Sequence, residues 1–357
     1  MKDTMGDTSA RKRLDYIDIA KALGMLAIMW GHVAVGNSVT FVYAFHIPLF
    51  FFLSGMVFVQ DKYPDFRSFV KRRIDTLIKP YIIYSFITWA IWALFSFATH
   101  VEVDSYWMPL LETFIAQGSE GYLVHNVPLW FVTCLFVVEL LYYWISKLPE
   151  IINVIVCLFL AVLSYVLIND CISFDFTTLP WSLEVAMAAI IFYAIGHLLI
   201  KNVGHQRVEL IVNKNKWLSL LVTIASFVIV YYGSLYNGKV SMGHANIHNP
   251  LIFYPIAFIG VLAFIIMCSL IAQSKVNDSK CIQVVKWFGQ NSFIAMVIHN
   301  PIKGFVIAAL ALVLGIKKMA IMRGTCTAVL AFLITLLTTI AIMLLINKIN
   351  NNSKDTK

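Results

Sequence analysis

Long apolar segments recur along the chain and are separated by short polar connections. A helix needs roughly 20 apolar residues to cross the hydrocarbon core of a bilayer, and these segments have about that length. The pattern therefore predicts an all-α fold, a polytopic integral-membrane bundle of about ten transmembrane helices. We place these helices at Ile17–Val35, Ala44–Val59, Leu77–Ala98, Leu129–Ile145, Ile151–Ile168, Leu183–Ile200, Trp217–Tyr236, Leu251–Ala272, Phe293–Leu314 and Ala328–Ile346.

The composition supports this fold class. Hydrophobic side chains make up 60% of the 357 residues and charged side chains 13%, and the mean hydropathy is +0.80. A soluble protein of this length could not cover so much apolar surface with polar side chains. We expect one membrane domain over residues 1–357, with cytoplasmic tails at 1–16 and 348–357. The first apolar segment contains Lys21 and has no small-x-small cleavage site, so we expect it to be retained.

Lysine and arginine collect in the N-terminal tail and in the loops after the second, sixth and eighth predicted spans, whereas 99–127 and 169–181 contain neither. Because positive charge favours the cytoplasmic side, we expect both termini in the cytoplasm, and the protein in a bacterial inner membrane. The net charge of +8 then reflects orientation rather than nucleic-acid binding. Lys317, Lys318 and Arg323 lie on the predicted outside, and a missed re-entrant segment is one explanation. The six cysteines are scattered without a metal-ligand spacing, so no metal site is expected.

The first span contains ionisable residues at membrane depth. In "DIAKALGMLAIMWGH", Lys21 and His32 are eleven residues apart, almost three helical turns, so they share one face about 16 Å apart along the axis. Asp18 is placed to pair with Lys21 at i, i+3. These side chains would cost a few kcal/mol if they faced lipid, so the polar face that they form indicates a cavity. The alternatives are that Lys21 snorkels to water and that His32 lies near the outer headgroups.

Three further polar residues stand in apolar segments. His46 opens "FHIPLFFFLSG", and a hairpin would bring it to the depth of His32. Glu139 lies near the middle of the fourth span and needs a partner or a cavity. His299 lies just before Pro301, which frees a backbone carbonyl for a neighbouring side chain; a structural kink is the simpler interpretation of this site.

Several motifs resemble the membrane-bound acyltransferase family 3. The pair Lys21 and His32 with ten residues between them, followed by "FHIPLFFFLSG", carries most of the resemblance. The run "RLDYIDIAKALGMLAIMWGH" is most similar to the fucose 4-O-acetylase-like branch. Further matches occur in the family's order and cover most of the chain: "KRRIDTLIKPY", "PLWFVTCLF", "LPWSLEVAMAAIIFYAIGHLL" and "GQNSFIAMVIHNP".

The resemblance implies an enzyme of about ten helices that takes an acyl group, usually acetyl, from cytoplasmic acyl-CoA. The acceptor would be a carbohydrate hydroxyl on a glycan or on a lipid-linked precursor. By position, His32 is the implied catalytic histidine, with Lys21 as its basic companion and Asp18 beside that lysine. The family commonly has two basic residues three apart before "PY", whereas here Arg73 is followed at that spacing by Thr76.

The residues suit this chemistry. A sugar hydroxyl is a poor nucleophile, and an imidazole, with a reference pKa near 6.5, can accept its proton during attack on a thioester. An acyl-histidine intermediate is the competing mechanism. The phosphates of acetyl-CoA need cations, and the run Lys71, Arg72, Arg73 and Lys79 is the candidate site. The same run is also explained by orientation alone.

Four residues are candidates for binding the acceptor: His46, Trp130, Glu184 and His299. Trp130 also fits an interfacial aromatic belt, and Glu184 fits a solvated interface. We interpret the chain as an O-acetyltransferase that modifies an envelope or exported polysaccharide. The alternatives are a transporter or flippase of a glycan or small metabolite, although no internal repeat is present, and transfer of another acyl group such as succinyl.

Overall fold

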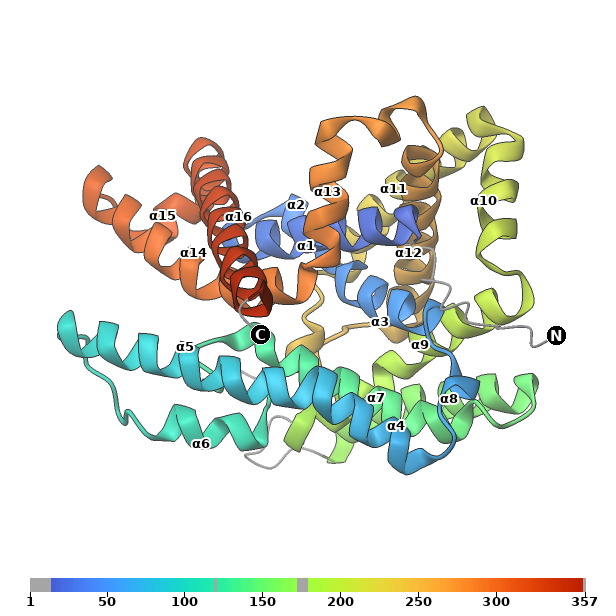
Figure 1. Cartoon of the computed structure of the whole chain (residues 1–357), viewed down its shortest axis with the longest axis horizontal. Coiled ribbons are helices and arrows are strands. Elements are labelled where there is room, and N and C mark those ends of the chain that lie inside the picture. Colours follow the sequence, from blue (N-terminus) through green and yellow to red (C-terminus); the bar gives the residue numbers. More distant parts are fainter. Residues whose placement is uncertain (1–13, 119–120, 172–178, 356–357) are drawn as a thin grey trace.

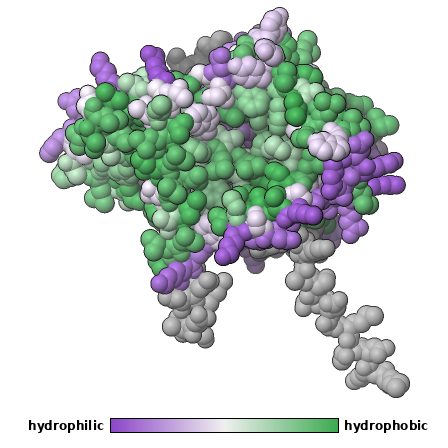
Figure 2. Space-filling view, turned by 90° about the horizontal axis from the view of Figure 1, so that it is seen from above, coloured by the Kyte–Doolittle hydropathy of each residue, from purple (hydrophilic) through white to green (hydrophobic). Residues whose placement is uncertain are grey.

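The computed structural model describes residues 14–118, 121–171 and 179–355. Over these ranges the chain is helical and forms no β-strand, only an isolated bridge between Ser241 and Asn246. Nine helical segments of the described chain are long and apolar enough to cross a membrane. Figure 2 shows a broad apolar surface with hydrophilic residues gathered at its margins. The predicted all-α membrane bundle is confirmed.

The first half of the chain supplies α1 to α9. Their bounds are α1 Asp15–Val33, α2 Asn37–Tyr43, α3 His46–Met56, α4 Phe66–Arg73, α5 Lys79–Ala98, α6 Met108–Ile115, α7 Trp130–Ile145, α8 Glu150–Val166 and α9 Leu183–Asn202. A π-helical turn, Ile74–Ile78, joins α4 to α5. Part of the loop expected before the third span is therefore helical, and residues 66–78 lead into α5 without a break.

The second half supplies α10 to α16. Their bounds are α10 His205–Lys214, α11 Lys216–Asn237, α12 Pro250–Ala272, α13 Lys280–Gln290, α14 Ser292–Leu314, α15 Lys318–Arg323 and α16 Thr325–Asp355. The last helix continues through most of the expected C-terminal tail. The basic residues of the expected N-terminal tail precede Leu14 and lie outside the described residues. The sidedness of both tails stays a prediction.

The first predicted span differs from the others. It forms α1 close to the expected bounds, but it is not among the nine apolar segments. Asp18, Lys21 and His32 lower its hydropathy, so protein rather than lipid has to enclose it. Accordingly, α1 contacts α2, α3, α12, α13, α14 and α16. In Figure 1 it lies among α12, α13, α14 and α16, above the group formed by α4 to α9.

Glycines allow the helices around α1 to approach closely. A Cβ on Gly55 of α3 would collide with the backbone of Tyr193 on α9, and a Cβ on Gly196 of α9 would collide with the backbone of Phe52 on α3. This reciprocal contact is the small-residue packing typical of membrane helices. Gly55 belongs to the "SG" pair at the end of "FHIPLFFFLSG", so this end of the motif serves helix packing.

We predict that Gly55→Ala and Gly196→Ala each lower the thermal unfolding midpoint in detergent, because each methyl group has to push two backbones apart. Gly304→Ala in α14 is the control, since a Cβ there meets no atom within 4 Å. Equal midpoints for all three variants would contradict the close-packing account.

Candidate active site

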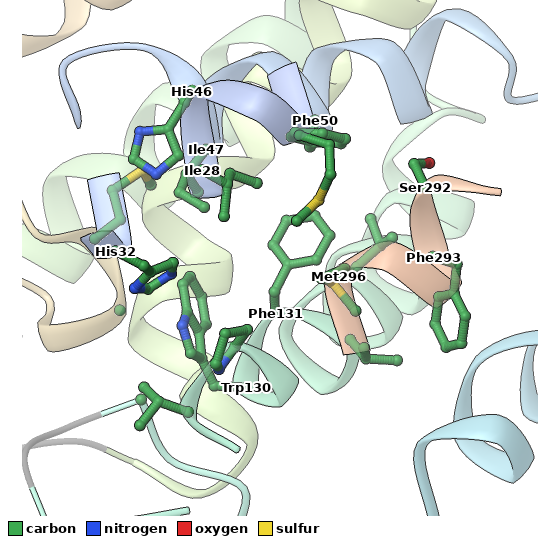
Figure 3. A pocket seen from close by; sticks show the side chains of 18 of the residues that line it. Ile28, His32, His46, Ile47, Phe50, Trp130, Phe131, Ser292, Phe293 and Met296 are labelled. Atoms are coloured by element: carbon green, nitrogen blue, oxygen red, sulfur yellow. The ribbon is translucent and has the colours of Figure 1, made fainter. Parts of the chain in front are cut away.

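Lys21 and His32 line one cavity of about 220 Å³. Its walls come from α1, α3, α7 and α14 and from the loop between α11 and α12, as Figure 3 shows for the labelled side chains. Apolar residues form most of the wall, including Met25, Ile28, Ile47, Phe50, Leu77, Phe131, Leu135, Phe293 and Met296. Lys21 and His32 therefore face a protein-walled space.

His46 lines the same cavity, and Figure 3 shows it at the same end of the cavity as His32. Its Nδ1 lies 2.8 Å from the carbonyl oxygen of Val42. Because a carbonyl only accepts, Nδ1 carries the proton, and Nε2 is left as an acceptor. The Tyr43 hydroxyl donates to the carbonyl of Gly31, at 3.3 Å, which ties α2 to the end of α1. The short connection after α1 thus brings both imidazoles to one cavity, as the sequence suggested.

His299 lies behind His32 rather than in the cavity wall. The two ring centroids are 5.4 Å apart, and His299 is fully buried. Its Nδ1 lies 2.7 Å from the carbonyl oxygen of Met296 and 3.0 Å from that of Ala295. His299 is not one of the lining residues of the cavity, so the expected contact with the acceptor is not supported by its position.

Pro301 produces the free carbonyl that the sequence predicts. Proline has no N–H for the carbonyl four residues earlier, which belongs to Val297. The side chain of Asn126, fully buried, donates to that oxygen at 2.7 Å. This contact attaches the segment before α7 to α14 and so fixes the turn of α14 that carries His299.

A second cavity, of about 330 Å³, is lined by Arg72 and Arg73 of the expected basic run, and also by Lys62 and Thr76. Thr76, which stands where the family commonly has a basic residue, therefore faces the same space. Lys71 and Lys79 are not lining residues, and Lys79 instead pairs with Asp75 at 2.6 Å. Lys62 is an addition that its loop position in the sequence did not reveal.

The two cavities adjoin. Ser54, Leu77 and Leu135 line both of them. Leu77 belongs to the π-helical turn, whose extra residue re-aims side chains and which is a frequent feature of functional sites. The arginines at the end of α4 and His32 at the end of α1 therefore line neighbouring cavities that share part of their walls.

Glu139 has the partner that the sequence could not name. Its Oε2 lies 2.8 Å from Nε of Arg73, an ionic contact whose geometry is not that of an aligned hydrogen bond. The Tyr193 hydroxyl also donates to Glu139, at 3.4 Å. The glutamate side chain is 5% exposed and the arginine side chain 21%. The ion pair holds the guanidinium of Arg73 at the wall of the second cavity.

Two expected site residues lie elsewhere. Among the described residues no ion pair within 4.0 Å joins Asp18 to Lys21, although the charge of Asp18 acts on Lys21. The carboxylate of Asp18 accepts a hydrogen bond from Gln290 of α13, at 2.9 Å. The reason for this contact is the close approach of α13, where Gly289 packs on the backbone of Asp18. Glu184 is fully buried at the start of α9 and accepts from the backbone N–H of Leu179, and it lines neither cavity.

The loop between α11 and α12 contributes residues that the sequence analysis missed. Ser241, Gly243 and His244 line the first cavity, and His244 is exposed as well. The Ser241 hydroxyl lies 2.6 Å from Nδ1 of His244. Gly243 packs against the indole of Trp130, another lining residue. The polar run "SMGHANIHNP" could have indicated these residues. It follows an apolar span, and Lys239 is the one basic residue beside it.

Lys239 carries positive charge to this loop. Its ammonium lies 4.5 Å from the ring centroid of Tyr43. Partial burial lowers the pKa of Lys239 below its usual value, because desolvation disfavours the charged amine. Lys239 is not a lining residue of the first cavity, to which this loop contributes Ser241, Gly243 and His244.

Residues 14–348 match the family model of an acyltransferase domain, Acyl_transf_3. The chain belongs to the acyltransferase 3 family. Comparison with curated proteins and with solved structures found no match. The fucose 4-O-acetylase-like branch stays a prediction. As a member of this family, the protein is a membrane acyltransferase, and its bundle contains both a basic cavity and an imidazole in a largely apolar one.

We predict that Arg73→Gln destabilises this acyltransferase by about 3–5 kcal/mol, because it leaves the buried carboxylate of Glu139 without its counter-charge. The double variant Arg73→Gln with Glu139→Gln should recover most of that loss, since it removes both charges. The thermal unfolding midpoint in detergent measures both effects. A double variant no more stable than Arg73→Gln alone would show that the pair is not the source of the loss.

Proposed function

We propose that this acyltransferase 3 protein transfers an acetyl group from acetyl-CoA to a sugar hydroxyl of a cell-envelope or exported polysaccharide, or of its lipid-linked precursor. The observation that carries the proposal is the contact between the two cavities. A basic cavity suits the phosphates of CoA, and a largely apolar cavity with an imidazole suits the acyl group. Together they form one donor site with the reacting end at His32.

Arg72 and Arg73 are the groups that would hold the donor's phosphates, because a guanidinium makes bidentate contacts with phosphate oxygens. Lys62 adds a third positive charge at the same wall. The thiol arm would then pass Ser54, Leu77 and Leu135 into the first cavity. Among the described lining residues of that cavity, Lys21 is the only one of the types Lys, Arg, Asp and Glu. The rest of the wall is neutral and mostly apolar, which suits a small acyl group such as acetyl.

His32 acts as the general base in this proposal. The acceptor O–H bond breaks as the proton moves to the imidazole, and the oxygen forms a bond to the thioester carbon. The carbon–sulfur bond then breaks, and the imidazolium returns the proton to the leaving thiolate. Atoms balance as alcohol and thioester give ester and thiol. The enclosed cavity limits competing attack by water.

The acceptor would enter from the opposite mouth, beside the loop between α11 and α12. His244 is exposed there while it also lines the cavity, and Ser241, Trp130 and His46 face the same space. Hydroxyl, imidazole and indole groups suit a sugar, which presents many hydroxyls and apolar ring faces. The donor mouth would lie on the cytoplasmic side of a bacterial inner membrane, where positive charge gathers, with both chain termini on that side.

We predict that His32→Gln lowers acetyl transfer at least ~100-fold, the range typical of a lost general base, while binding of acetyl-CoA is retained. Transfer is measured with labelled acetyl-CoA in membranes, and surface glycans of deletion and complemented cells are compared by mass spectrometry. His197→Gln is the control, because that histidine bonds to Tyr142 away from both cavities. Normal transfer by His32→Gln would contradict the proposed role.

We predict that Arg72→Gln raises the KM for acetyl-CoA about tenfold, since one charge-assisted phosphate contact contributes roughly 1.5–3 kcal/mol. Lys201→Gln is the control, because Lys201 forms an exposed ion pair with Glu150 at 2.9 Å and lines neither cavity. An unchanged KM for Arg72→Gln, or an equal rise for Lys201→Gln, would argue against a donor site in the second cavity.

A further inference from the structure

His299 has one nitrogen bound to backbone and one without a partner. The carbonyls of Ala295 and Met296 accept from Nδ1–H, so the ring is fixed in one tautomer and Nε2 carries a lone pair. No hydrogen-bond partner for Nε2 is present in the described part of the structure, and the atom is buried. Such an acceptor is costly to leave unpaired, which indicates a partner in the working state.

The imidazole of His32 is the ring beside that acceptor. The two centroids are 5.4 Å apart with the planes at 45°. Imidazoles joined by an N–H···N bond of about 3 Å have ring centres about 5 Å apart. The observed separation is close to that value, and catalytic hydrogen bonds commonly shorten when substrate binds.

Among the described residues, the charged groups that act on His32 include no carboxylate that could orient it. They are His46 of α3, His299 and Lys303 of α14, and Lys239 of the loop between α11 and α12. A catalytic imidazole usually has its second nitrogen held by an acceptor, which selects the tautomer and the ring orientation. Both His46 and His299 have a backbone bond that fixes the tautomer and leaves Nε2 as an acceptor. Of these two, His299 is the one whose Nε2 is buried without a partner in the described residues and whose ring contacts that of His32. A neutral ring also avoids the cost of a carboxylate at membrane depth.

We infer that His299 is a positioning residue that accepts a hydrogen bond from the imidazole N–H of His32 and so directs the other nitrogen of His32 toward the acceptor hydroxyl. The inference rests on the proposed function. His299 exchanges no atoms with the substrates: the acceptor proton passes to His32 and from His32 to the departing thiolate. Asn126 supports the arrangement, because its contact with the carbonyl of Val297 fixes the turn of α14 that carries His299.

Two substitutions test the roles of the two nitrogens of His299 separately. Asparagine places an amide near the position of Nδ1, so His299→Asn keeps the backbone anchor and removes the acceptor. Glutamine reaches the position of Nε2, so His299→Gln keeps an acceptor for His32. We expect His299→Asn to lower kcat ~30-fold with the KM for acetyl-CoA within about twofold of wild type, and His299→Gln to restore kcat to within about fivefold of wild type.

The wild-type protein and the thermal unfolding midpoint complete the test. Absence of acetyl transfer by the wild-type protein would defeat the proposed function itself. An active wild type with equal kcat values for the asparagine and glutamine variants would overturn the positioning role alone. If kcat and the unfolding midpoint fell together in both variants, His299 would have a structural role, and the positioning role would also be overturned.

Discussion

A helix with a lysine and a histidine at membrane depth has to keep both side chains away from lipid. This constraint on α1 determines how the rest of the bundle is arranged. Helices from both halves of the chain surround α1, and glycines in α3, α9 and α13 bring backbones close enough to seal the wall. The enclosed volume that remains around Lys21 and His32 is the candidate active site.

The same constraint explains the buried polar contacts elsewhere in the bundle. Two polar groups at depth have a specific partner on another helix or loop: Glu139 has Arg73, and the Val297 carbonyl exposed by Pro301 has Asn126. Unpaired, these groups would cost several kcal/mol in a bilayer. When paired, they hold Arg73 at the second cavity and His299 behind the first one. The contacts that make these polar groups stable at membrane depth therefore also position the site.

Much of this arrangement could be predicted from the sequence because helical periodicity and membrane length act locally. The spans, the shared face of Lys21 and His32, and the carbonyl freed at Pro301 all follow from residues within one segment. Contacts between segments that are distant in the sequence could not be predicted in this way. Asp18 is within reach of Lys21 along α1, yet Gln290 of α13 takes its carboxylate. Arg73 and Glu139 are far apart in sequence, and the loop with His244 becomes part of the wall only when α11 and α12 are packed.

The central claim is that one continuous path joins the arginines of α4 to His32. The most direct measurement is a structure of the protein with a non-hydrolysable acetyl-CoA analogue bound. The account predicts phosphates against Arg72 and Arg73, the thiol arm beside Ser54, and the acyl carbonyl carbon within about 4 Å of the His32 ring. An analogue bound outside the second cavity, or with its acyl end away from His32, would contradict it.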